Sequence, residues 1–242
     1  MFSNTNDIAF IQEIQGVIDS ANIQVNGEVL DAMDLFLPFF RQPLYPLVSV
    51  DLVGDTLKIK QGDRPFLHNP DSELAESEFG YQYSVILRWT QTEEEQIIGN
   101  SEIEVPATNG VIKLNRGQTG YYRVKYDGVL QQRIIDQLNT AHTEIDELDR
   151  TGLIDDAFNL AIAGEIPYSA ALDMIKYVSK TDNMEESYFV WSVFSARTSY
   201  MRSQLAGTPT GVKFIAYFQE AIAAQFTRFG FTPGPTDSHI EK

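Results

Sequence analysis

The spacing of apolar residues changes twice along the chain. In residues 7–20, isoleucine and valine recur every three or four positions, which predicts an amphipathic helix. Residues 28–40 keep this spacing and predict a second helix, which Pro38 should kink or end because proline cannot donate a backbone hydrogen bond. Two short helices bury little apolar surface by themselves. We therefore interpret residues 1–42 as the end of a larger unit.

From Pro46 onward, apolar residues alternate with polar ones, which is the period of a half-buried strand. Gly54 supplies a turn after the first strand, a long strand is expected over residues 81–89, and residues 91–96 form a charged hairpin tip. Further strand signals lie at Ile97–Ile98, Ile103–Val105, Val111–Leu114 and Tyr121–Tyr126. About seven short strands separated by turns predict a small antiparallel β-sandwich over residues 43–128.

After Gly128 the apolar spacing returns to that of a helix. Helices are expected over residues 129–142, 151–163, 169–180, 185–205 and 210–229. Gly164 and Gly207 mark helix ends. Successive helices joined by short loops are typical of antiparallel pairs and of stacked α-solenoids. Residues 129–242 are therefore predicted to form a helical array.

Composition narrows the classes of partner. The chain has 242 residues and a formal charge of −16, from 18 basic and 34 acidic residues, so its surface repels nucleic acid and anionic membranes. There is no cysteine, which excludes disulfides and thiolate chemistry. The N-terminus lacks the basic and apolar regions of a signal peptide, and no apolar run could span a bilayer. A soluble chain with no nucleic-acid partner and no membrane segment is expected.

No catalytic, cofactor-binding or metal-ligating residue is predicted in this chain. His68, His142 and His239 are far apart, so no H-E-x-x-H pattern exists. No G-x-S-x-G nucleophile motif and no glycine-rich phosphate loop occurs. A hydrolase that uses scattered carboxylates is a further alternative.

The pair Asp155 and Asp156 is the most enzyme-like feature, since paired carboxylates can share acid and base roles. Adjacent helical residues, however, point about 100° apart and do not share a site well. In a helix that begins near residue 151, the pair would lie in the first turns and stabilise the helix dipole. We favour that structural interpretation.

The tyrosines of residues 121–126 could form a ligand-stacking patch or pack in a core. On an alternating strand, Tyr122, Val124 and Tyr126 share one face, and Tyr121, Arg123 and Lys125 share the other. Packing of one face in the core is the favoured interpretation.

Two long motifs resemble a known family. Residues 120–127 (GYYRVKYD) and 149–161 (DRTGLIDDAFNLA) are similar to the zinc aminopeptidases related to aminopeptidase N, puromycin-sensitive aminopeptidase and the endoplasmic-reticulum aminopeptidases. In that family the first motif closes a small β-sandwich and the second opens a helical C-terminal domain. The matching residues are Gly120, Tyr121, Tyr122, Arg123, Val124, Tyr126, Asp127, Asp149, Arg150, Leu153, Ile154, Asp155, Asp156, Ala157, Phe158, Asn159, Leu160 and Ala161.

The resemblance extends over roughly residues 28–240, with further matches at residues 45–66, at Trp89 and at residues 186–191. It implies a mixed fold: two N-terminal helices, a small antiparallel β-sandwich, and an α-helical (HEAT-like) array. Departures from the family pattern lie at Phe39, Leu44, Gly62, Asp63, Lys125, Thr151, Gly152 and Val190. These departures indicate a divergent member.

The family's catalytic parts lie upstream of the matching region. The G-x-M-E-N motif, the H-E-x-x-H zinc site and the transition-state tyrosine map onto no position here. The resemblance therefore implies that residues 1–42 are a remnant of a catalytic domain, that 43–128 are the β-sandwich and that 129–242 are a truncated helical domain. Zinc would belong to the missing catalytic domain, and this chain would need no cofactor.

In the family, the corresponding region walls the substrate chamber and supports domain packing, so peptide substrates would reach this chain through the parent's catalytic domain. The alternative is a stand-alone, non-catalytic relative that binds peptides or proteins. Homo- or hetero-oligomers, and a parent that is cytoplasmic or a membrane-anchored ectoenzyme, are left open. A severed chain should also expose apolar side chains at both ends: Phe36, Phe39, Phe40, Phe214, Phe218, Ile222 and Phe226.

Overall fold

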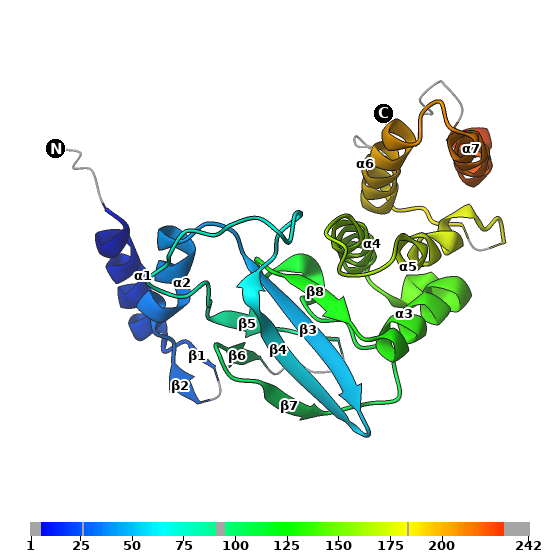
Figure 1. The fold of residues 1–242 in the computed structure, drawn as a ribbon. Helices are drawn as coiled ribbons and strands as arrows, with labels where there is room; N and C mark the ends of the chain where they lie inside the picture. The colour runs from blue at the N-terminus through cyan, green and yellow to red at the C-terminus, as the bar shows by residue number, and fades with distance from the viewer. Residues whose placement is uncertain (1–5, 26, 91–94, 183, 230–242) are drawn as a thin grey trace. The chain divides into compact units, whose positions relative to one another are not determined.

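The computed structural model describes residues 6–25, 27–90, 95–182 and 184–229 (Figure 1). It divides the chain into two compact units, residues 1–133 and 134–242, which we call the sheet unit and the helical unit. The division into three domains expected from the sequence stays a prediction. Most of the expected hairpin tip and all of the tail after residue 229 lie outside the described residues.

The chain begins with two helices, as the apolar spacing predicts. α1 (Asp7–Ala21) starts where the Asn6 side chain accepts a hydrogen bond from the Ala9 N–H at 2.8 Å. α2 (Ala32–Arg41) is capped in the same way by Asp31. It therefore starts four residues later than predicted, and residues 28–29 instead form β2 (Glu28–Val29), paired with β1 (Gln24–Val25). Pro38 does not end the helix, which runs on to Arg41.

The principal sheet has four strands in the order β7-β4-β3-β8. β3 (Pro46–Val53) and β4 (Thr56–Pro65) form an antiparallel hairpin, turned by Gly54 at a φ of +62°. β7 (Ile103–Pro106) pairs antiparallel to β4, whereas β8 (Arg123–Tyr126) pairs parallel to β3. The all-antiparallel arrangement expected from the sequence is therefore wrong at β8. A second sheet joins β5 (Val85–Leu87) and β6 (Gln96–Ile98).

The long strand predicted over residues 81–89 is only partly formed. All five alternating apolar residues in it are buried, but only Val85–Leu87 is a strand. The reason lies in Gln61, whose side-chain amide donates to the Tyr83 carbonyl at 2.6 Å and accepts from the Tyr83 N–H at 3.2 Å. A side chain thus takes the place of a partner strand there. Trp89 forms only an isolated bridge with Leu114.

Both sheets contribute to one apolar core. Its buried members are Val48, Val50, Leu57, Ile59, Tyr83, Val85, Leu87, Trp89, Ile98, Val105, Ile112, Leu114, Tyr122, Val124 and Leu130. The register places Val50 opposite Ile59 and Val48 opposite Val124, so each strand sends the same face to this core.

The rest of the chain is helical, as predicted. Its elements are α3 (Gly128–Ala141), η2 (His142–Glu144), α4 (Glu147–Ile162), α5 (Tyr168–Met174), η3 (Lys176–Ser179), α6 (Tyr188–Gln204) and α7 (Pro209–Phe229); η1 (Arg116–Gln118) precedes β8. The helix predicted over residues 169–180 is split into α5 and η3. α4 packs against α5 and α6. A strand-rich part followed by a helical part is confirmed, and a HEAT-like array stays a prediction.

The expected exposure of apolar side chains holds only in part. Phe40 is exposed, while Phe36 and Phe39 are half-buried. On α7 the expectation is confirmed for Phe226, which is exposed, and is wrong for Phe214, which is buried. Phe218 and Ile222 are half-buried, and Phe218 stacks on Phe194 with ring centroids 5.6 Å apart. Val212 and Ile215, which were not expected, are also exposed.

Candidate functional site

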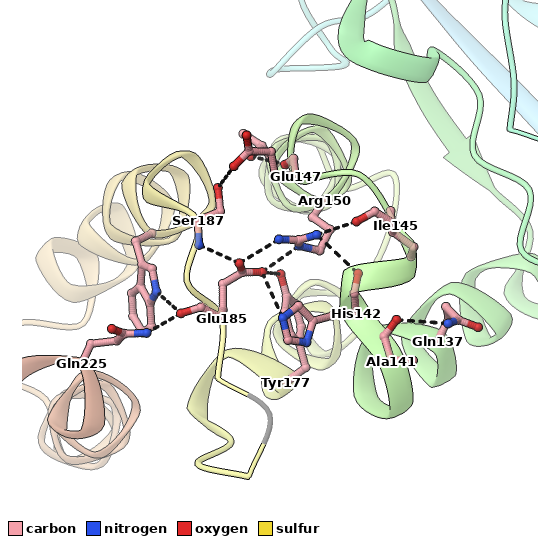
Figure 2. Close-up of polar contacts among 12 residues, drawn as sticks. Gln137, Ala141, His142, Ile145, Glu147, Arg150, Tyr177, Glu185, Ser187 and Gln225 are labelled. Carbon is pink, nitrogen blue, oxygen red and sulfur yellow. Dashed lines mark hydrogen bonds and ion pairs between the residues drawn. The ribbon is translucent and has the colours of Figure 1, made fainter. Parts of the chain in front are cut away.

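The helical unit contains a buried carboxylate at its centre, that of Glu185, in the segment between η3 and α6 (Figure 2). Glu185 is 0% exposed. Arg150 of α4 donates two hydrogen bonds to it, from Nε to Oε2 at 2.7 Å and from Nη2 to Oε1 at 2.8 Å. The Tyr177 hydroxyl donates to Oε2 at 3.0 Å, and the Ser187 N–H donates to Oε1 at 2.9 Å. Both oxygens are therefore satisfied by two donors each.

The backbone of Glu185 joins two more helices. Its carbonyl oxygen accepts hydrogen bonds from Trp191 Nε1 of α6 at 2.9 Å and from Gln225 Nε2 of α7. Next to it, the Ser187 hydroxyl donates to the Glu147 carboxylate of α4 at 2.6 Å. One short segment thus connects α4, η3, α6 and α7.

Arg150 extends the network to the turn that precedes α4. Its Nη1 donates to the carbonyl oxygens of His142, at 3.4 Å, and of Ile145. The His142 ring lies beside Tyr177, with centroids 5.2 Å apart, and its Nε2 is 4.0 Å from Glu185 Oε2. His142 Nδ1 has no hydrogen-bond partner among the described residues.

Burial and charge act in opposite directions on these groups. Burial alone would raise the pKa of Glu185, but the hydrogen bonds and positive charge of Arg150 hold that pKa below its usual value. Burial lowers the pKa of His142, so its imidazole is neutral near pH 7. Burial also raises the pKa of Tyr177 well above its usual value, which keeps the hydroxyl a donor to Glu185. The cluster is therefore one ion pair surrounded by neutral donors.

This arrangement holds the helices together. It is closed to a substrate, because the Glu185 carboxylate is fully buried and both of its oxygens already accept hydrogen bonds. In the described part of the chain, no three histidine, aspartate, glutamate or cysteine side chains are placed to hold a metal ion. No helix of that part is long and apolar enough to cross a bilayer.

The strand motif of residues 120–127 lies in the sheet unit. Tyr122 and Val124 are buried and Tyr121 is exposed, as the alternation predicts. The Tyr126 hydroxyl accepts the Leu114 N–H at 2.9 Å. The Asp127 carboxylate accepts the Leu130 N–H at 2.8 Å and so caps α3, while Arg123 Nε donates to the Tyr45 hydroxyl at 3.1 Å.

The helix motif of residues 149–161 forms most of the buried face of α4. Its buried members are Asp149, Arg150, Gly152, Leu153, Ile154, Asp156, Ala157, Phe158, Asn159, Leu160 and Ala161. The dipole interpretation of Asp155 and Asp156 is wrong, because α4 begins at Glu147 and the pair lies well past its first turn. Asp155 instead forms an ion pair with Arg197 of α6, whose Nε lies 2.7 Å from Oδ1.

Sequence reasoning found Arg150 but missed its partners. Glu185 and Tyr177 belong to neither motif, His142 is one of three widely separated histidines, and Glu185 lies 35 residues after Arg150. No local pattern connects residues so far apart. The available signal was the arginine itself, on the apolar face of a helix where a charge requires a partner.

The structure thus has a strand-rich region followed by a helical region with a buried ion pair at its centre. The family model described as the ERAP1-like C-terminal domain matches residues 111–242, which is more than half of the chain, and the chain belongs to that family. The resemblance inferred from the two motifs is thereby confirmed.

Curated relatives agree. Aminopeptidase N of Homo sapiens is 26% identical over 236 residues, covering 94% of this chain and 23% of the relative. Glutamyl aminopeptidase of Sus scrofa is 30% identical over 213 residues, covering 84% of this chain and 21% of the relative. Glutamyl aminopeptidase of Mus musculus is 27% identical over 250 residues, covering 100% of this chain and 24% of the relative. The chain thus spans less than a quarter of the length of these relatives.

Proposed function

We propose that this chain is the non-catalytic C-terminal region of a zinc aminopeptidase-like protein, and that its helical unit walls the chamber where a separate catalytic domain holds peptide substrates. The observation that carries this proposal is the match of residues 111–242 to a C-terminal domain family. The named aminopeptidases that align with the whole chain, or nearly so, are about four times longer.

The zinc chemistry is assigned to a domain outside this chain. A bound zinc ion would supply an activated water and polarise the peptide carbonyl. The described residues offer no group that fits such an ion, since no three candidate ligands converge. The contribution of this chain is then mechanical: Glu185 and Arg150 keep the helices in a fixed arrangement.

The alternative, a stand-alone relative that binds peptides or proteins without cleaving them, is favoured by one observation. The sheet unit contains an aromatic pocket of about 380 Å³, a size typical of small-ligand sites. The two proposals share the fold and differ in whether a catalytic domain is covalently attached.

Two activity measurements separate them. The purified chain, supplied with zinc salt, is expected to release no product from aminoacyl anilides. An antibody raised to the chain should capture, from the source tissue, an aminopeptidase activity that a chelator abolishes. Turnover by the purified chain, or captured protein without peptidase activity, would contradict the main proposal.

A further inference from the structure

The sheet unit has an open pocket beside its apolar core. It has a volume of about 380 Å³ and lies between α2, the segment at residues 84–88 and the segment at residues 119–122. Its walls include Phe36, Phe39, Ile86, Arg88, Tyr121 and Tyr122. Pockets of this size, mostly apolar with a few polar groups, are typical of ligand sites.

Aromatic rings continue from this pocket to the surface. Phe39 lies 4.7 Å from Tyr83 and 6.2 Å from Tyr121, measured between ring centroids. Tyr121 also contacts Tyr45, at 4.9 Å. Yet Tyr121 remains 66% exposed at the rim. An aromatic or large aliphatic group of a ligand, bound in the pocket, would cover the exposed ring of Tyr121 at a favourable distance.

A smaller cavity of about 290 Å³ adjoins the pocket and shares Leu35 and Ser84 with it. Its lining residues include three acidic ones, Glu28, Asp31 and Asp34. Asp31 caps α2, but Glu28 and Asp34 form no ion pair within the described residues. The pocket is therefore bordered on one side by two carboxylates available to a cation.

Inside the pocket the charge is balanced. Arg88 lines it and forms an ion pair with Glu95, so the wall carries no net positive charge to attract an anion. An apolar group with a cation a few ångströms away is thus the chemistry that complements both cavities.

We propose that this pocket binds a peptide, taking up one large apolar or aromatic side chain while an adjacent lysine or arginine lies against Glu28 and Asp34. A peptide fits because it carries both groups on neighbouring residues and its backbone can lie across the open rim. The site lies wholly within this chain and needs no catalytic domain. It rests on the peptide-binding alternative given under the proposed function, for which it names the ligand and the residues, and its failure would leave the main proposal standing.

The first test is calorimetric titration of the purified chain with the acetylated, amidated hexapeptide Ala-Ala-Phe-Lys-Ala-Ala. A dissociation constant of about 10–100 µM is expected for a fragment of this size. Replacing its phenylalanine with alanine should abolish measurable binding, and replacing its lysine with glutamate should weaken binding at least about fivefold. No binding of the parent hexapeptide, or equal binding of the alanine peptide, would overturn the proposal.

Two variants locate the site. Tyr121→Ala should weaken binding about fivefold, in the range measured for aromatic pairs. Asp34→Asn should reduce the preference for lysine over glutamate in the peptide. Both residues are exposed, so folding should be kept, which circular dichroism checks. The matched controls, Tyr188→Ala on α6 and Asp71→Asn, also alter exposed residues and should bind normally.

Unchanged affinity in Tyr121→Ala would place binding elsewhere and overturn the proposal. Concentration-dependent dimerisation that Tyr121→Ala abolishes, without peptide binding, would also overturn it, because the occupant would then be a second copy of this chain. Either result would remove the observation that favours the stand-alone alternative and would leave the main proposal, which rests on the family match, unaffected.

Discussion

Each unit buries apolar side chains, but the helical unit also has a buried ion pair at its centre. In the sheet unit, two sheets pack apolar side chains into one core, with Gln61 as a satisfied polar exception. In the helical unit, four elements converge on one buried residue, Glu185. α4 and η3 contact its carboxylate, and α6 and α7 contact its backbone carbonyl. Truncating an apolar core residue destabilises a protein roughly in proportion to the buried side-chain atoms that are removed. Removing one partner of a buried ion pair destabilises it strongly, because the other charge stays buried and unpaired.

The comparison suggests that the helical unit is the more fragile of the two. Four of its elements contact Glu185, and Arg150 loses its only carboxylate partner among the described residues if Glu185 is altered. The chain offers a direct way to observe each unit, since it has two tryptophans, Trp89 in the sheet core and Trp191 beside Glu185.

The largest effect is expected from Glu185→Ala. The change leaves the buried Arg150 guanidinium without its carboxylate partner, although the His142 and Ile145 carbonyls still accept from it. The helical unit should therefore lose about 3–5 kcal/mol of stability. In urea unfolding, the Trp191 signal, isolated by Trp89→Phe, should move to much lower urea. The Trp89 signal, isolated by Trp191→Phe, should stay in place.

The matched control is Glu186→Ala, which alters the next, exposed glutamate. It should change stability by no more than about 0.5 kcal/mol. Equal shifts for Glu185→Ala and Glu186→Ala would show that the buried ion pair does not hold the helices.

The sheet unit should be most sensitive at a backbone position. A Cβ atom at Gly120 would lie 2.2 Å from the Tyr122 ring, which is fixed in the core. Gly120→Ala should therefore destabilise the unit by about 1–3 kcal/mol, as overpacking does. The Trp89 signal measures this loss. Gly99→Ala, where an added Cβ meets nothing within 4 Å, should leave the midpoint unchanged.

Acid should distinguish the units through His142. Burial lowers its folded pKa below the ordinary value of 6.5, so the unfolded chain takes up the proton first. The contribution of neutral His142 to the free energy of unfolding is therefore fully present above pH 6.5. It is lost as the pH falls below 6.5, by at most about 1.4 kcal/mol per pH unit. Below about pH 4.5, the lowered pKa of Glu185 adds a second loss of the same sign.

The check is urea unfolding of the helical unit between pH 7.5 and 5, followed at Trp191. His142→Gln should flatten the slope seen in the parent chain. An unchanged slope in the variant would assign the acid sensitivity to other groups.

The smallest expected effect is a gain. Gly16 lies exposed inside α1, and an added Cβ meets nothing within 4 Å. Gly16→Ala should stabilise that helix by about 0.5–1 kcal/mol, because alanine loses less backbone entropy. Thermal unfolding by circular dichroism should show a small upward shift, and a downward shift would mean that the space at Gly16 is occupied.

Sequence reasoning succeeded where structure follows from local spacing. The helices predicted over residues 7–20 and 210–229 appear as Asp7–Ala21 and Pro209–Phe229. It failed where a single side chain overrides the apolar spacing. Asp31 caps α2, which therefore begins later than predicted, and the Gln61 side chain takes the hydrogen bonds of Tyr83 that a neighbouring strand would have made. The network around Glu185 was out of reach, because the contacts of Glu185 with Arg150 and Gln225 join residues 35 and 40 positions apart.

The central claim is that this chain belongs to a longer protein whose catalytic domain lies upstream. The most direct measurement is the mass of the native polypeptide in its source tissue, detected with an antibody raised to this chain. The account predicts a band several times heavier than 27.3 kDa, as in relatives of which the chain covers less than a quarter. A band at 27.3 kDa alone would contradict it and would indicate a free-standing binding protein.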